Sequence, residues 1–200
     1  MHREVFAAFD RLCREYGGGG VVLEIGATGS DDTLLCLPAL TESSRRFGIN
    51  MAPQTATHGF EIIVGNANEM TTVPDVSIDT VLCNSVLEHD ARFWLTLAEV
   101  RRVLKPGGLF LVGVPGYSER RRASWLTRLL SLLLPASLPL GRSLQGKAAS
   151  TPTLVVHRYP RDYYRFGCDA IGDVFLAEMD IVTIEEIMNP PRFIAVARQR

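Results

Sequence analysis

The pattern of apolar and polar positions divides the chain into short strands separated by helices. Residues 2–16 place apolar side chains at helical spacing, and four consecutive glycines then end that helix. Five short runs of apolar or β-branched residues follow, and each predicts a buried strand. These runs cover residues 21–25, 47–50, 60–64, 79–84 and 109–114.

Helical patterns lie between these runs. Residues 88–104 carry apolar side chains on one face, and Pro106-Gly107-Gly108 stops the helix. Pro38 is expected in the first turn of a shorter helix that runs to about Arg46. Strands that alternate with helices predict a parallel sheet with right-handed crossover connections.

The last 30 residues follow a different pattern. Residues 171–177 predict a helix, and 181–187 and 193–197 predict two strands joined through Asn189-Pro190-Pro191. So short a link cannot hold a crossover helix, so these two strands are expected to pair antiparallel.

Composition fits one domain over residues 1–200, since 46% of the residues are hydrophobic and 22% are charged. The net charge of −1 gives the chain as a whole no electrostatic attraction to nucleic acid. The four cysteines have no CxxC spacing and no His cluster, so we expect buried reduced thiols and no metal. No leader-like or membrane-spanning apolar run is present, which favours a cytoplasmic protein.

Residues 116–156 interrupt the alternation of strands and helices. They contain Arg120 to Arg122, Trp125 and a leucine-rich run, and residues 116–150 carry a net charge of +5. This helical insertion is expected to form a lid that binds substrate. A homodimer contact and a membrane-surface contact are the alternatives.

Residues 21–30 combine a strand with a loop that holds Glu24, Gly26 and Gly29. Ligands of doubly wound sheets bind outside the carboxyl ends of the strands, where this loop falls. Glycine lets a backbone approach a ligand closely, although a tight turn without a ligand would also use Gly26.

Three blocks in this order, residues 21–30, 78–89 and 103–108, resemble the class I S-adenosylmethionine-dependent methyltransferases, in particular the small "methyltransferase domain 11" type. The resemblance implies an α/β fold: a Rossmann-like, doubly wound, mostly parallel seven-stranded sheet with a C-terminal antiparallel hairpin. It also implies S-adenosyl-L-methionine as cofactor and S-adenosyl-L-homocysteine as product.

The same resemblance implies a cofactor site at the ends of strands one to four. Glu24 and the glycines would cradle the methionine part, while Asn50 and Asn66 stand where the family often has acids that contact ribose and adenine. The alternative is that Asn50 and Asn66 only cap turns. The residues assigned to the cofactor are Glu24, Gly26, Ala27, Gly29, Asn50, Met51, Asn66, Ala67, Asn84 and Ser85.

Residues 157–166 resemble a segment that precedes the last helix in a subgroup of small methyltransferases. His157 is the first choice for a general base and His89 the second, with Asp162 and Tyr163 as further catalytic candidates. The alternative is that these side chains form a buried polar network that anchors the lid.

The predicted function is metal-independent methylation, on oxygen, of a small natural-product or sugar-bearing metabolite. The competing hypothesis is a catalytically degenerate methyltransferase fold that binds a ligand or supports a partner, motivated by Thr28, Ser30, Asn50 and Asn66. A dinucleotide-binding dehydrogenase is disfavoured because the first loop lacks GxGxxG.

Overall fold

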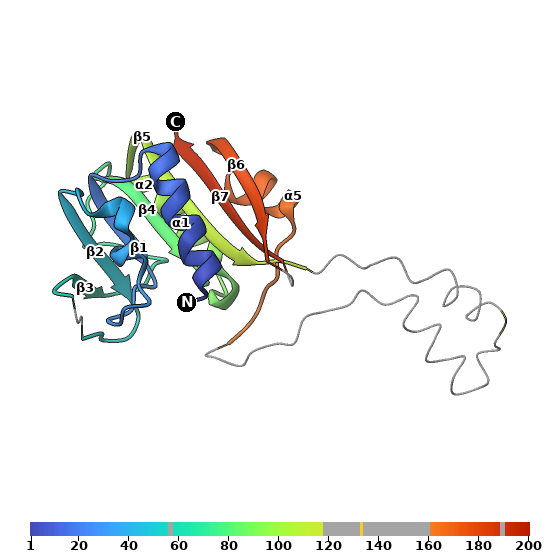
Figure 1. The fold of residues 1–200 in the computed structure, drawn as a ribbon, viewed down its shortest axis with the longest axis horizontal. Helices are drawn as coiled ribbons and strands as arrows, with labels where there is room; N and C mark the ends of the chain where they lie inside the picture. Colours follow the sequence, from blue (N-terminus) through green and yellow to red (C-terminus); the bar gives the residue numbers. More distant parts are fainter. Residues whose placement is uncertain (56–57, 118–132, 134–160, 189–190) are drawn as a thin grey trace. The chain divides into compact units, whose positions relative to one another are not determined.

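A seven-stranded sheet forms the centre of the unit built from residues 1–116 and 157–200 (Figure 1). The computed structural model describes residues 1–55, 58–117, 133, 161–188 and 191–200. The strands follow the order β3-β2-β1-β4-β5-β7-β6. This order places the first half of the sheet on one side of β1 and the second half on the other, as in a doubly wound fold.

Five adjacent strands pair parallel, and the last strand in the chain pairs antiparallel with both of its neighbours. The parallel strands are β1 (Val21–Ile25), β2 (Arg45–Asn50), β3 (Glu61–Val64), β4 (Ile78–Asn84) and β5 (Leu104–Pro115). Strand β7 (Arg192–Gln199) lies antiparallel between β5 and β6 (Met179–Ile187). The predicted fold class, a mostly parallel sheet that closes with an antiparallel hairpin, is therefore confirmed.

Helices cover both faces of the sheet (Figure 1). One face carries α1 (Arg3–Tyr16) and the 3-10 turns η1 (Leu34–Cys36) and η2 (Pro38–Leu40). The other face carries α2 (Phe93–Val103), the short α5 (Cys168–Ala170) and the π-helical η4 (Ile171–Phe175). Two hydrophobic clusters result, one on each side, because successive residues of each strand point to opposite faces.

Helix α1 is held by caps at both of its ends and by one half-buried hydrogen bond to a neighbouring turn. The His2 ring accepts a hydrogen bond from the Glu4 backbone amide, and Gly17, at φ 75°, ends the helix in the left-handed conformation. The Asp10 carboxylate accepts a hydrogen bond of 2.7 Å from the Ala39 amide, which joins α1 to η2. The helix predicted over residues 2–16 is thus confirmed.

Two predicted boundaries were wrong. The helix expected from Pro38 to Arg46 is only the turn η2, because Arg45 and Arg46 already belong to β2. Strand β5 begins at Leu104, directly after α2, so Pro106-Gly107-Gly108 lies inside the strand. Ile78 and Thr80 face Leu104 and Leu109, so residues 105–108 bulge out of the ladder.

The helix expected over residues 88–104 starts later, at Phe93, after a separate 3-10 turn η3 (Leu87–His89). Residues 168–175 replace the helix expected over 171–177 and end in a π-helical turn. All four cysteines are free, as expected, but Cys168 is exposed and Cys36 is only half-buried.

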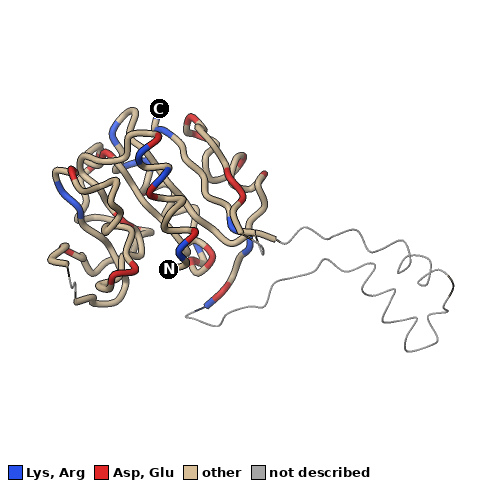
Figure 2. Tube along the Cα trace, viewed as in Figure 1, with Lys and Arg blue, Asp and Glu red and all other residues tan. Residues whose placement is uncertain are grey.

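Charged side chains of both signs alternate on the surface of α1 (Figure 2). Arg11 pairs with Glu15 at 3.1 Å and Arg14 pairs with Asp10 at 3.0 Å, each one turn away along the helix. Such pairs form a mixed surface rather than a basic patch. The basic segment predicted at residues 116–150 lies outside the described residues, apart from Gly116, Tyr117 and Leu133. Among the described helices, none is long and apolar enough to cross a membrane.

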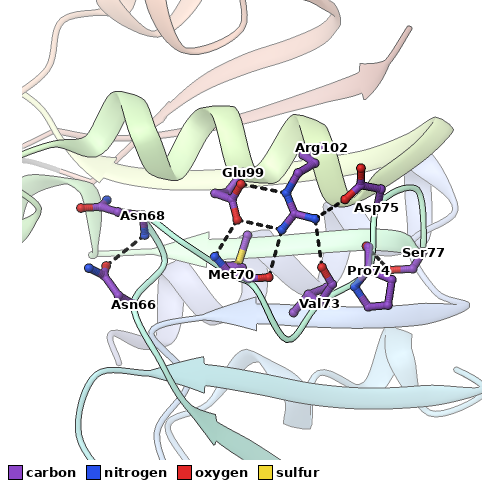
Figure 3. Close-up of polar contacts among 9 residues, drawn as sticks. All are labelled: Asn66, Asn68, Met70, Val73, Pro74, Asp75, Ser77, Glu99 and Arg102. Atoms are coloured by element: carbon purple, nitrogen blue, oxygen red, sulfur yellow. Dashed lines mark hydrogen bonds and ion pairs between the residues drawn. The ribbon is translucent and has the colours of Figure 1, made fainter.

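The loop before β4 is fastened to α2 by Arg102 (Figure 3). Its guanidinium donates to the backbone carbonyls of Met70 and Val73, at 2.9 and 3.0 Å, and pairs with Glu99 at 2.7 Å. Glu99 in turn accepts a hydrogen bond of 2.6 Å from the Met70 amide, and Asp75 pairs with Arg102 from the other side. This network holds the segment that connects β3 with β4.

Candidate functional site

The carboxyl ends of the parallel strands meet at one edge of the sheet. Register brings Ile25 beside Ile49 on β2 and beside Cys83 on β4, and Asn84 beside Gly113 on β5. The residues predicted for the cofactor site, from Glu24 to Ser85, lie in the last two residues of these strands or in the loops that leave them. The structure thus gathers them at the edge where doubly wound folds bind ligands.

The loop after β1 passes extremely close to its neighbours. Gly26 has φ +80°, and its amide donates a hydrogen bond of 2.8 Å to the Ile49 carbonyl. A Cβ at Gly26 would lie 2.4 Å from Val86 Cγ2, and a Cβ at Gly48 would lie 2.2 Å from the Cβ of Ala27. Only glycine fits at both positions, so the backbone forms a tight cradle. Gly48 and Val86 were not among the predicted site residues.

Glu24 lies under this loop and accepts hydrogen bonds from the segment that follows it. Its carboxylate is buried and accepts hydrogen bonds from the Thr33 hydroxyl and, at 3.2 Å, from the Leu35 amide. Burial raises the pKa of the Glu24 carboxyl to about 7, and the hydrogen bonds only partly oppose that shift. Direct contact of Glu24 with the cofactor stays a prediction, while its observed contacts organise the turn at η1.

The rest of the first loop contacts the segment that follows β2. The Gly29 amide donates to Gln54 Oε1 at 3.3 Å, and His58 Nε2 lies 2.6 Å from Asp31 Oδ1. Thr28 and Ser30, which stand in place of the family's later glycines, contact each other at 3.1 Å through their hydroxyls.

Asn50 joins two loops at the end of β2. Its amide nitrogen donates a hydrogen bond of 2.8 Å to the Ala27 carbonyl, and its amide oxygen accepts one of 3.0 Å from the Ala52 amide. A carboxylate could not make the first bond, because it has no proton to donate. The neighbouring Met51 is 77% exposed.

Asn66 and Ala67 follow β3. Asn66 is exposed, and its side-chain oxygen accepts a hydrogen bond of 3.0 Å from the Asn68 amide, which makes an Asx turn (Figure 3). Asn68 then donates to Asp90 at 2.7 Å and to Thr96 at 2.9 Å, so this loop is tied to the start of α2. Ala67 is half-buried.

Asn84 and Ser85 end β4 beside an arginine that sequence reasoning missed. Ser85 has φ +57°, and its amide donates to the Gly113 carbonyl at 2.9 Å. Its hydroxyl accepts a hydrogen bond from the Arg192 guanidinium at the start of β7. The side-chain oxygen of Asn84 is buried and has no hydrogen-bond partner among the described residues.

The turn η3 contacts the segment 161–166. The Tyr163 amide donates to the Glu88 carbonyl at 2.8 Å, and the His89 ring nitrogen Nδ1 lies against the Arg161 carbonyl. Asp162, whose side chain is fully buried, pairs with Arg165. The catalytic candidates His89, Asp162 and Tyr163 are therefore brought to one place.

Tyr163 is 43% exposed, whereas His157, the first choice for a base, lies outside the described residues. The structure adds Glu88, a fully buried glutamate that was not among the predicted site residues. Its position directly after Leu87 in an apolar run was the available signal. In the part of the chain that the structure describes, no group of three or more His, Cys, Asp or Glu side chains could hold a metal ion.

Comparisons with known proteins agree with this geometry. Residues 23–112 match the family model described as a methyltransferase domain. An uncharacterised 37.1 kDa protein from a transposon of Streptomyces fradiae is 30% identical over 109 residues. That match covers 50% of this chain and 32% of the relative, so the chain spans about a third of the relative's length.

Solved structures share the fold over nearly the whole chain. The 1,6-didemethyltoxoflavin-N1-methyltransferase of Burkholderia thailandensis, with bound 1,6-didemethyltoxoflavin and S-adenosylhomocysteine, has a TM-score of 0.64 at 16% identity. The match covers 97% of this chain and 77% of that one. The N-methyltransferase NodS of Bradyrhizobium japonicum WM9, in complex with S-adenosylhomocysteine, also has a TM-score of 0.64, at 13% identity and with 98% and 86% covered.

The magnesium protoporphyrin IX methyltransferase of Synechocystis PCC 6803 has a TM-score of 0.61 at 12% identity, with 100% of this chain and 83% of that chain covered. The seven-stranded sheet defines a Rossmann-like α/β protein, a class in which ligands bind at the carboxyl ends of the strands. The match over residues 23–112 and the shared fold make the chain similar to the class I S-adenosylmethionine-dependent methyltransferases.

Proposed function

We propose that this protein transfers a methyl group from S-adenosylmethionine to an oxygen atom of a small-molecule acceptor. The observation that carries the proposal is the cradle formed by Gly26, Gly48 and Ala27, with Val86 against it. Val86 and Ala27 fill the space beside these glycines, so the loop after β1 turns tightly against β2 at the carboxyl edge of the sheet, where ligands of doubly wound folds bind.

The residues at this edge fit the cofactor of the class. Gly26 and Ala27 would hold its methionine part, Asn50 and Met51 would face its ribose, and Asn66 and Ala67 would face its adenine. The side-chain oxygen of Asn84, which has no hydrogen-bond partner among the described residues, would accept a hydrogen bond from a donor on the cofactor. When bound, the cofactor supplies an electrophilic methyl group on a sulfonium.

The protein's own task is to align the acceptor with that methyl group and to remove the acceptor's proton. His157 and His89 are the proposed bases. The His89 ring contacts the Arg161 carbonyl, which fixes the orientation of the ring against the segment that contains Asp162 and Tyr163. That the acceptor is small is supported by the fold relative crystallised with 1,6-didemethyltoxoflavin.

The remaining features of the proposal concern the surroundings of the reaction. We propose a natural-product or sugar-bearing metabolite as acceptor, a reaction that needs no metal, and a cytoplasmic location. Residues 116–156 would serve as the lid over the acceptor, with a homodimer contact and a membrane-surface contact as their alternative uses.

A second candidate function, a methyltransferase fold without catalysis, is favoured by one observation. Both polar atoms of the Asn50 side chain already bond to backbone groups of the protein, at 2.8 and 3.0 Å. The side chain that should accept the ribose hydroxyls is thus engaged elsewhere. Such a protein would bind a partner rather than turn over a substrate.

Calorimetric titration with S-adenosylhomocysteine tests the proposed cofactor. We expect the unmodified protein to bind it with a dissociation constant in the micromolar range. We expect Gly26→Ala to weaken that binding at least about tenfold, because the new Cβ displaces Val86 and strains the backbone at positive φ.

Two variants control for the strain. Gly107 has φ +74° and no atom within 4 Å of a Cβ, so Gly107→Ala carries the same backbone strain away from the site and should bind like the unmodified protein. The double variant Gly26→Ala, Val86→Ala should regain part of the affinity. Absence of binding heat at millimolar ligand in the unmodified protein would instead favour the degenerate fold.

A further inference from the structure

Four buried polar atoms at the carboxyl edge of the sheet lack hydrogen-bond partners among the described residues. They are both carboxylate oxygens of Glu88, the side-chain oxygen of Asn84 and the Nε of Arg192. Glu88 is completely buried. A buried polar group without a partner costs about 1–3 kcal/mol, so proteins rarely leave one unless another molecule completes it.

These atoms come from three elements that meet at one place. Asn84 ends β4, Glu88 lies in η3 four residues later, and Arg192 begins β7 beside Pro115 of β5. Ser85 connects them, because its hydroxyl accepts a hydrogen bond from the Arg192 guanidinium. The group borders the cofactor cradle, since Val86, between Ser85 and Glu88, fits against Gly26.

The charged pair in this group is not joined by a salt bridge. Glu88 and Arg192 attract each other electrostatically, yet no contact within 4.0 Å joins them, whereas Asp162 and Arg165 next to them do pair. Burial raises the pKa of the Glu88 carboxyl and lowers the pKa of Arg192. The buried position therefore disfavours the charged form of each group. Charges held in this way are typical of functional sites.

We propose that Glu88 and Arg192, next to Asn84 of the cofactor site, form the polar end of the acceptor subsite. The acceptor has a neutral O–H nucleophile, and Glu88 takes the proton of that hydroxyl. The inference rests on the proposed methyl transfer and adds to it the chemical class of the acceptor group. The inference thus assigns to Glu88 the proton removal that was proposed above for His157 or His89.

The chemistry balances without a further reactant. The acceptor O–H donates its proton to Glu88, while a lone pair of that oxygen forms the new bond to the methyl carbon. The carbon–sulfur bond breaks, and its electrons remain on sulfur as the neutral thioether. Glu88 then releases the proton to water, and Arg192 stabilises the carboxylate before and after transfer.

Charged and titratable groups face Glu88 from several elements. Arg192 on β7, His89 beside it on η3 and Arg165 in the segment 161–166 each favour its ionised form. The pKa of the Cys83 thiol on β4 is raised by burial and, in addition, by the negative charge of Glu88. The preference of the subsite for a proton-donating group should therefore increase with pH, as the ionised fraction of Glu88 rises.

Two fluorinated probes test the subsite on the whole protein saturated with S-adenosylhomocysteine. 4-Fluorophenol carries an O–H, while 4-fluoroanisole has the same ring with a methyl ether instead. Fluorine NMR titration gives a dissociation constant for each. We expect 4-fluorophenol to bind at least about fivefold more tightly, because a hydrogen bond to a carboxylate is strong.

Glu88→Gln should reduce this preference to less than about twofold without changing the affinity for S-adenosylhomocysteine. Glu186→Gln, which changes an exposed glutamate on β6, is the control and should behave like the unmodified protein. The melting temperature supplies a second readout. Glu88→Gln should leave it unchanged or raise it by about 2 °C, because no partner of the carboxylate is lost.

The outcomes separate the two proposals. If the unmodified protein binds no S-adenosylhomocysteine, the proposed function fails. If it does bind but shows no preference for the phenol, or if Glu88→Gln retains the preference, the acceptor subsite is overturned. A melting temperature lowered by several degrees in Glu88→Gln would also overturn it, since the carboxylate would then be part of the fold.

Discussion

The Glu24 carboxyl is buried, and none of its hydrogen-bond partners among the described residues is a cation. Its partners are the Thr33 hydroxyl and the Leu35 amide, and both are neutral donors. Desolvation therefore outweighs hydrogen bonding, and the folded protein holds the proton of this carboxyl more tightly than the unfolded chain does. Stability must then depend on pH in a direction opposite to that of an ordinary salt-bridged acid.

We predict that the free energy of unfolding falls as pH rises from 4.5 to 7. The pKa of Glu24 is about 7 in the folded state against 4.5 for an ordinary glutamate. In this window the folded state binds more protons, so the stabilisation present at low pH is lost as pH rises, by about 3 kcal/mol at most. Urea unfolding at a series of pH values measures it.

Glu24→Gln should flatten this dependence, because an amide does not titrate. Glu42→Gln, which changes an exposed glutamate, should leave the curve of the unmodified protein unchanged. An equally steep fall in Glu24→Gln would assign the effect to another group, with Glu88 as the first candidate because its pKa is shifted in the same direction.

At the level of single residues, the sequence located the site but not the bonds within it. The order of the motifs sufficed to place Gly26, Asn50 and Ser85 at the strand ends. The pairing of Ser85 with Arg192 joins positions 107 residues apart and depends on the antiparallel insertion of β7. No local pattern encodes such a contact, so Arg192 was missed.

Asn50 illustrates the same limit. The family comparison suggests only that an acid is absent, whereas the structure shows what the amide does instead. It donates to the Ala27 carbonyl and so closes the loop after β1 against the end of β2. The substitution has a structural purpose that sequence comparison alone does not reveal.

At the level of elements, strands were predicted well and helix ends poorly. Buried strands show as apolar runs, and the first four predicted runs end at the last residues of β1 to β4. The helix expected after Pro38 failed because Leu37 and Leu40 are buried against the sheet by two separate turns. A short apolar stretch fits either arrangement, so tertiary packing decides it.

Strand β5 could not be delimited for a related reason. Proline and two glycines normally end an element, yet here they form a bulge opposite a single residue of β4. The pairing of Leu104 with Ile78 starts the strand before the bulge.

The network around Arg102 should contribute strongly to the attachment of α2. We predict that Arg102→Ala lowers the free energy of unfolding by about 2 kcal/mol, because the Met70 and Val73 carbonyls and the Glu99 carboxylate all lose a donor. Urea unfolding measures the change.

Arg14→Ala removes the exposed ion pair between Arg14 and Asp10, which lie one helical turn apart. It should lower the free energy of unfolding by no more than about 0.5 kcal/mol. Equal losses in Arg102→Ala and Arg14→Ala would mean that the Arg102 network of Figure 3 does not hold the loop.

At the level of the whole molecule, the sheet is strongest at its centre. Strands β1, β4 and β5 are buried on both faces. Strand β3 at one edge and β6 at the other consist mainly of residues that are half-buried or exposed. We predict that amide hydrogen exchange, followed by mass spectrometry, is slowest in β1, β4 and β5 and at least about tenfold faster in β3 and β6.

Binding of S-adenosylhomocysteine should slow exchange further at the loops after β1 and β4. Protection gained first at β6 would place the ligand away from the carboxyl edge and contradict the proposed site.

The position of β7 has a consequence for synthesis on the ribosome. This strand follows every other strand in the chain, yet it pairs between β5 and β6. Until Arg192–Gln199 leave the exit tunnel, the apolar flank of β5 has no neighbour on that side and β6 has no strand to join. Arg192 arrives with the same segment, so the nascent chain completes its sheet and its proposed acceptor subsite in a single late step.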